Sequence, residues 1–212
     1  MKKLEFYYDF GSPNAYLAWR VMPRIAARTG AEVVHFPFLL GGLFRLTGNR
    51  APSEAFAGIK NKLEYEDREL MRFVERHQLP AYRRNEHFPV NTLQLMRGAV
   101  ASERLGLAEA YRAAIYTGMW EKSLKLDDPA VLLATLEQAD LPAKDILALM
   151  QSDEVKQQLI ANTENAFARG AFGAPTFFVG DEIFFGKDRL GEVEDELMSQ
   201  PALSAEADRR TN

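Results

Sequence analysis

The 212-residue sequence contains no cysteine. This absence excludes a disulfide framework, a thiolate metal site and redox chemistry by the protein's own sulfur. Any thiol that takes part in its chemistry must therefore come from another molecule. Histidine is also scarce: His35, His77 and His87 fall in different segments without metal-ligand spacing, so we expect no metal site.

Long hydrophobic runs and an excess of positive charge are lacking as well. No stretch approaches the ~20 apolar residues of a membrane span, and the opening residues, MKKLEFYYDF, contain no apolar run of signal-peptide length. The formal net charge of -4 provides no broad positive field to attract phosphate backbones. We therefore expect a cytoplasmic protein that binds neither membranes nor nucleic acids.

The residues that are present predict a succession of short strands and helices. An apolar run at residues 4–8 indicates a buried strand, and the helix after it has Ser12 as N-cap, Pro13 at its first position and Gly30 at its end. A second strand is predicted within residues 31–40, and almost all of residues 53–169 has a helical pattern. Two apolar runs at 176–179 and 183–185 then flank a Gly180-Asp181 turn, which is typical of a hairpin, and a last helix is predicted over 188–198.

This order predicts the fold class. Without the helical block, the chain is a β-α-β unit followed by a β-β-α unit, which is the order of a thioredoxin-like fold. We therefore predict an α/β protein: a thioredoxin-like fold with a large all-helical insertion domain. Residues 1–42 and 170–212 form the predicted thioredoxin-like domain, and residues 43–169 form the helical insertion domain.

Ser12 stands where many thioredoxin-like oxidoreductases have the first cysteine of a Cys-x-x-Cys motif. A helix N-terminus contributes roughly 0.3–1 kcal/mol to an anion there, up to ~2 when partly buried, and a hydrogen bond to a charged group contributes about 1.5–3 kcal/mol. The Ser12 hydroxyl could therefore help to hold the thiol of a bound cofactor as a thiolate. On local sequence alone, a simple N-cap is the more common role for such a serine.

The segment GAPTFF places Pro175 directly before the predicted third strand. In a thioredoxin-like fold a cis-proline stands at this boundary, beside the start of the first helix, and the residue before it offers its backbone to an extended peptide. We therefore predict a cis Ala174-Pro175 bond.

The segments FYYDFGSPNAYLA and GAFGAPTFFVGDEIFFGKDRL, with the helical block between them, resemble the glutathione-dependent kappa-class transferases and their bacterial relatives, the 2-hydroxychromene-2-carboxylate isomerases. The resemblance covers nearly the whole chain, and the closing hairpin is more similar to the isomerases. It implies glutathione as the cofactor and an aromatic small molecule as the substrate. A homodimer is suggested by the resemblance alone.

The resemblance also implies roles for individual residues. Ser12 matches the catalytic serine that activates the glutathione sulfur, and Ala174, before Pro175, matches the residue whose backbone pairs with the cysteinyl part of glutathione. These three positions form the expected core of the site.

Four further positions match residues that bind the ends of glutathione. Asp188 and Arg189 match the segment that holds the γ-glutamyl end, while Asn49 and Lys62 match kappa-class positions that bind glutathione from the helical domain. Without the resemblance, Asp188 would be expected to cap the last helix and Lys62 to be a solvated surface lysine.

The substrate side differs from the family pattern. The isomerases place a lysine after the second strand, where this chain has Phe44. Arg45 or Arg50 could instead supply a positive charge for a substrate carboxylate, although arginines in a polar loop are more often solvated. Asn91 opens a predicted helix, where we expect an N-cap that can also face the site.

The leading functional hypothesis is a glutathione-dependent cis/trans isomerase of the 2-hydroxychromene-2-carboxylate type, which acts on an unsaturated aromatic keto acid through reversible thiolate addition. One alternative uses the same site as a kappa-class-like glutathione transferase and ends in a stable conjugate. The other is a non-catalytic thioredoxin-like binding module without cysteines.

Overall fold

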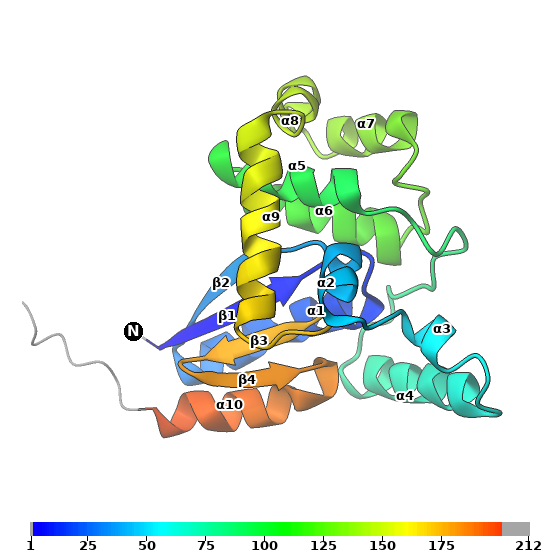
Figure 1. Cartoon of the computed structure of the whole chain (residues 1–212), viewed down its shortest axis with the longest axis vertical. Coiled ribbons are helices and arrows are strands. Elements are labelled where there is room, and N and C mark those ends of the chain that lie inside the picture. Colours follow the sequence, from blue (N-terminus) through cyan, green and yellow to red (C-terminus); the bar gives the residue numbers. More distant parts are fainter. Residues whose placement is uncertain (1, 201–212) are drawn as a thin grey trace, which may run out of the picture.

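The computed structural model describes residues 2–200 of the chain. Its centre is a four-stranded sheet in the order β2-β1-β3-β4 (Figure 1). Strand β1 (Lys3–Tyr8) runs parallel to β2 (Glu32–Pro37) and antiparallel to β3 (Thr176–Val179), which forms a hairpin with β4 (Glu182–Phe185). The predicted α/β fold and the predicted hairpin are therefore confirmed.

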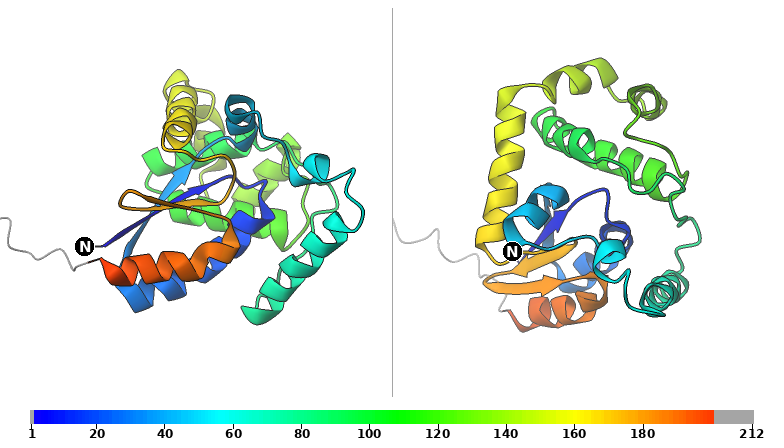
Figure 2. Two further views of the ribbon diagram at one scale, coloured as in Figure 1. Left: turned by 60° about the horizontal axis from the view of Figure 1, so that its bottom comes forward. Right: turned by 45° about the vertical axis from the view of Figure 1, so that its right-hand side comes forward.

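Helices cover both faces of the sheet because alternate side chains of β1 are apolar in both directions. Phe6 and Tyr8 belong to the cluster formed with α1 (Pro13–Thr29) and α10 (Leu190–Ser199). Tyr7 points to the opposite face, where it packs with residues of α2 (Leu40–Thr47) and α9 (Asp153–Ala168). Figure 2 shows α1 and α10 side by side on one face and α9 on the other.

The remaining helices lie between β2 and β3 in the sequence. They are α3 (Pro52–Ala55), α4 (Lys62–Arg76), α5 (Leu93–Arg104), α6 (Ala108–Trp120), α7 (Pro129–Gln138) and α8 (Ala143–Leu149). Helices α5 and α6 pack closely because Gly98 leaves room for the Tyr111 ring, whose hydroxyl donates a hydrogen bond to the Leu95 carbonyl at 3.0 Å. Within residues 2–200, no helix is long and apolar enough to cross a membrane.

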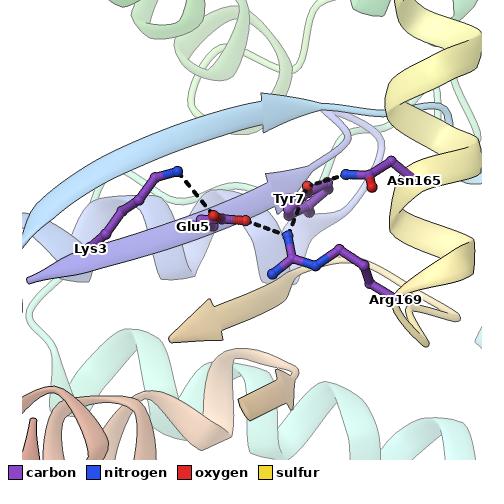
Figure 3. Close-up of polar contacts among 5 residues, drawn as sticks. All are labelled: Lys3, Glu5, Tyr7, Asn165 and Arg169. Atoms are coloured by element: carbon purple, nitrogen blue, oxygen red, sulfur yellow. Dashed lines mark hydrogen bonds and ion pairs between the residues drawn. The ribbon is translucent and has the colours of Figure 1, made fainter. Parts of the chain in front are cut away.

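One polar cluster joins the end of α9 to the sheet (Figure 3). Arg169, directly after α9, donates hydrogen bonds to the Glu5 carboxylate and the Tyr7 hydroxyl, and Asn165 also donates to Tyr7, at 2.9 Å. Partial burial acts to raise the pKa of Glu5, but hydrogen bonds from Arg169 and Lys3 bring it below its ordinary value. The chain therefore returns from the helical block to the sheet through a fixed junction.

The sequence-based domain division stays a proposal, and parts of it, residue 1 and residues 201–212, lie outside the described residues. The proposed boundary after residue 42 falls inside α2, whose Leu43 packs against the sheet with Tyr7 and Phe178. The last helix differs slightly from the prediction: residues Lys187–Arg189 form a 3₁₀ turn, and α10 begins at Leu190.

Candidate active site

Ser12 is the N-cap of α1 and is only 5% exposed. Its Oγ accepts a hydrogen bond from the Ala15 N–H at 3.2 Å and donates one to the Ala174 carbonyl at 2.9 Å. The hydroxyl therefore caps its own helix, as local sequence indicated, and also joins this helix to the segment before β3. Pro13 has no N–H, and the Asn14 N–H has no hydrogen-bond partner among residues 2–200, so an unused donor remains at the helix start.

The Ala174-Pro175 peptide bond is cis, which confirms the prediction. The segment that contains it is held on both sides: the Asn49 side chain donates to the Phe172 carbonyl at 2.8 Å, and the Gly186 N–H donates to the Pro175 carbonyl at 2.9 Å. The Ala174 N–H has no hydrogen-bond partner among residues 2–200. Ser12, Ala174, Pro175 and Asn49 are thus connected through direct contacts and one short segment.

Asp9 organises the loop between β1 and α1, a role that the sequence analysis missed. Its carboxylate accepts the N–H groups of Gly11 and Leu40, both at 2.8 Å. Complete burial raises the pKa of Asp9, although these hydrogen bonds oppose the shift. One side chain therefore fixes the Ser12 loop relative to the first turn of α2. An aspartate directly after a buried strand was the available signal.

The segment before α10 contains a second missed residue, Lys187. Its side chain is only 4% exposed, and its Nζ donates to both carboxylate oxygens of Asp188 at 2.7 and 2.8 Å. The same ammonium lies 5.0 Å from the centroid of the Phe73 ring in α4. Asp188 itself is 65% exposed, so a buried lysine orients an accessible carboxylate. Arg189, the other predicted residue here, pairs with Glu192.

The predicted residues of the helical block have local partners. Lys62, the first residue of α4, pairs with Glu66 and lies 5.0 Å from the Phe56 ring centroid. The predicted N-cap role of Asn91 is wrong, because the N-cap of α5 is Thr92. Asn91 precedes it, and its Oδ1 accepts the Leu93 N–H at 3.0 Å. Arg50 is exposed beside Asn49, which accepts its N–H.

Arg45 lies elsewhere. It lines a cavity between α2, α5 and α9 to which neither Ser12 nor Ala174 contributes. Among residues 2–200, no group of three or more histidine, aspartate and glutamate side chains is placed to hold a metal ion. The structure therefore joins Ser12 directly to Ala174, links Asn49 to the same segment through the Phe172 carbonyl, and places Arg45 at a different cavity.

A family model described as DSBA-like thioredoxin domain matches residues 3–198. The 2-hydroxychromene-2-carboxylate isomerase of Sphingobium xenophagum is 30% identical to this chain over 199 residues, which cover 93% of this chain and 98% of that protein. The glutathione S-transferase kappa 1 of Rattus norvegicus is 26% identical, with 88% of this chain and 87% of the relative covered. The solved structure of a 2-hydroxychromene-2-carboxylate isomerase superposes with a TM-score of 0.78 at 25% identity and covers 91% of this chain and 93% of the other.

Proposed function

The chain belongs to the family of 2-hydroxychromene-2-carboxylate isomerases and kappa-class glutathione transferases, with a DsbA-like thioredoxin domain, and on this premise we propose that it is a glutathione-dependent isomerase of unsaturated aromatic keto acids. Its membership makes it an enzyme of the isomerase and glutathione-transferase type rather than a non-catalytic binding module. The observation that carries the finer proposal is the hydroxyl of Ser12, which stands beside the unpaired Asn14 N–H and the Ala174 backbone.

The residues around Ser12 fit a bound thiol tripeptide. When bound, glutathione would supply a thiolate that adds reversibly to an electrophilic carbon, so that the former double bond can rotate. The Asn14 N–H and the helix dipole favour negative charge at the start of α1. The Ala174 N–H can donate to a peptide carbonyl, and the Asp188 carboxylate, oriented by Lys187, can receive an ammonium group.

Ser12 would exchange one hydrogen bond for another when it donates to a sulfur. A hydrogen bond to a charged group is worth about 1.5–3 kcal/mol and a neutral one about 0.5–1.5 kcal/mol, so the net gain is about 1 kcal/mol. This difference corresponds to roughly one pKa unit of the thiol. The exchange would also free the Ala174 carbonyl to accept an N–H of the tripeptide, which couples binding of the sulfur to binding of its backbone.

The decisive experiment measures the thiol pKa of bound glutathione from its ultraviolet thiolate absorbance. We expect Ser12→Ala to raise this pKa by about one unit and to slow turnover. The matched control is Ser152→Ala, because Ser152 is the N-cap of α9 and accepts the Val155 N–H in the same way. An unchanged thiol pKa in Ser12→Ala would contradict the proposed role.

Product analysis separates the two activities of the family. An isomerase regenerates glutathione, so its concentration should stay constant while the aromatic substrate is converted. Stoichiometric consumption of glutathione, with a stable conjugate as the product, would show a transferase instead. Both outcomes use the same site around Ser12, so they leave the thiol measurement unaffected.

A further inference from the structure

The cavity between α2, α5 and α9 is separate from the Ser12 site. It has a volume of about 260 Å³, and none of Ser12, Ala174, Asp188 or Asn49 contributes to its lining. Figure 1 shows the three helices meeting above the sheet, with α2 beside the lower half of α9. Its chemistry can therefore be considered independently of the glutathione proposal.

One wall of this cavity is apolar and accessible. Leu46 of α2 and Ile160 of α9 are 45% and 47% exposed, and both line the hollow together with Leu93 of α5. Large aliphatic side chains that remain exposed around a hollow favour the binding of an apolar group, because its burial removes their surface from water. The wall is therefore suited to an apolar group.

The other feature of the lining is positive charge. Arg45, Arg97 and Lys156 line the cavity, against Glu164 as the only acidic residue in the lining. Lys156 pairs with Asp153 at 3.1 Å, whereas neither arginine makes an ion pair or a side-chain hydrogen bond with any of residues 2–200. Arg97 is partly buried, and its guanidinium has no protein partner among residues 2–200. An anion would supply that partner.

We propose that this cavity is a second binding site that takes a small aromatic carboxylate. Arg97 would bind the carboxylate through its planar fork of N–H donors, with Arg45 adding positive charge, and the ring would lie against Leu46 and Ile160. The volume is at the lower end of ligand pockets, which limits the ligand to about two fused rings. An inorganic anion would leave the apolar wall uncovered, so the basic and apolar parts of the lining together favour a carboxylate on an apolar body, and the small volume fits a compact aromatic acid.

Calorimetric titration with 2-naphthoate tests this proposal, with 2-naphthalenemethanol as the neutral analogue. We expect the acid to bind the native protein more tightly than the alcohol. Arg97→Gln should weaken binding of the acid at least tenfold, as expected for a lost charged hydrogen bond, and Arg97→Lys should restore part of it. Arg104→Gln is the matched control, because Arg104 is an exposed arginine of the same helix outside the cavity.

Two further variants distinguish this site from the Ser12 site. Ile160→Trp should block the cavity from an exposed position and abolish binding of the acid, while Ser12→Ala and saturating glutathione should leave its affinity unchanged. Lack of binding to the native protein, equal affinity in Arg97→Gln, or a loss of affinity with glutathione or Ser12→Ala would each overturn the proposal. An unchanged thiol pKa in Ser12→Ala would contradict the proposed role of Ser12 but would not affect this proposal, because binding of the acid to the cavity does not involve glutathione.

Discussion

At the scale of single residues, Ser12 makes two hydrogen bonds whose roles can be separated. The bond from the Ala15 N–H belongs to helix capping, and the bond to the Ala174 carbonyl joins two segments that are far apart in the sequence. A serine that only capped a helix would make the first of these. The second makes Ser12 structurally important even before any cofactor is considered.

The first prediction concerns stability. Ser12→Ala should lower the free energy of unfolding by about 1–3 kcal/mol, because it removes a cap and leaves the buried Ala174 contact unmade. Ser152→Ala removes a cap alone and should lower it by about 1 kcal/mol. Chemical denaturation of both variants measures the difference. Equal losses would mean that the bond to Ala174 adds nothing to stability.

At the scale of elements, β2 contains a histidine that folding keeps neutral. His35 pairs with Phe6 of β1, and its ring makes an edge contact with the Phe6 ring at a centroid distance of 5.7 Å. Burial, together with the positive charge of Arg112, lowers the pKa of His35 to about 3. The unfolded chain binds this proton near the ordinary pKa of about 6.5.

The second prediction follows from this shift. The folded-state pKa of His35 lies below its unfolded-state pKa, so the unfolded chain binds this proton first as the pH falls. The contribution of neutral His35 to the unfolding free energy is therefore complete above about pH 6.5 and is lost as the pH falls toward 3. Unfolding free energy should fall by about 1–2 kcal/mol between pH 6.5 and 5 from this group. In His35→Phe this part of the pH dependence should disappear, whereas His87→Gln, at an exposed position, should keep it. Identical pH slopes in His35→Phe and the native protein would contradict the assignment.

The third prediction concerns the packing of α5 on α6. A Cβ at Gly98 would overlap the Tyr111 hydroxyl, which is itself buried and bonded to the Leu95 carbonyl. Gly98→Ala should therefore lower the unfolding free energy by about 1–3 kcal/mol through overpacking. Gly191→Ala in α10 meets no atom within 4 Å and should raise stability by up to about 1 kcal/mol. Thermal denaturation of both variants tests the contrast, and a stabilised Gly98→Ala would contradict it.

The same scale shows what the sequence could predict. Ser12 as a cap and the β3–β4 hairpin depend on neighbouring residues, so local patterns indicated both. The cis bond before Pro175 was instead predicted from the place of this proline in a thioredoxin-like fold. The Asp9 carboxylate accepts the Leu40 N–H from a segment distant in sequence, and no local pattern indicates this partner. Lys187 was missed for a related reason: a lysine is ordinarily exposed, and here the 3₁₀ turn that contains it packs against α1, α10 and β4, with Phe73 of α4 beside its ammonium.

At the scale of the whole molecule, the sheet and the helical block share one hydrophobic core. A single cluster contains Tyr8 of β1, Tyr16 of α1, Trp120 of α6 and Ile146 of α8. The Trp120 Nε1 also donates to the Phe10 carbonyl at 2.8 Å, inside the loop that leads to Ser12. Any unfolding of the helical block would therefore expose the face of the sheet that contains Tyr8 and release the loop that leads to Ser12.

The last prediction is a single cooperative unfolding transition. Near-ultraviolet circular dichroism reports the packing of aromatic side chains such as Tyr8, Tyr16 and Trp120, and far-ultraviolet circular dichroism reports the helices. Because both depend on the same core, the two denaturation curves should coincide. Arg169→Gln should shift both curves together by about 1–3 kcal/mol, because it leaves the partly buried Glu5 with the half-exposed Lys3 as its remaining cationic partner. Arg84→Gln breaks an exposed ion pair with Asp67 and should cost no more than ~1 kcal/mol. Two separate transitions, or an Arg169→Gln effect limited to one probe, would instead show that the helical block unfolds independently of the sheet.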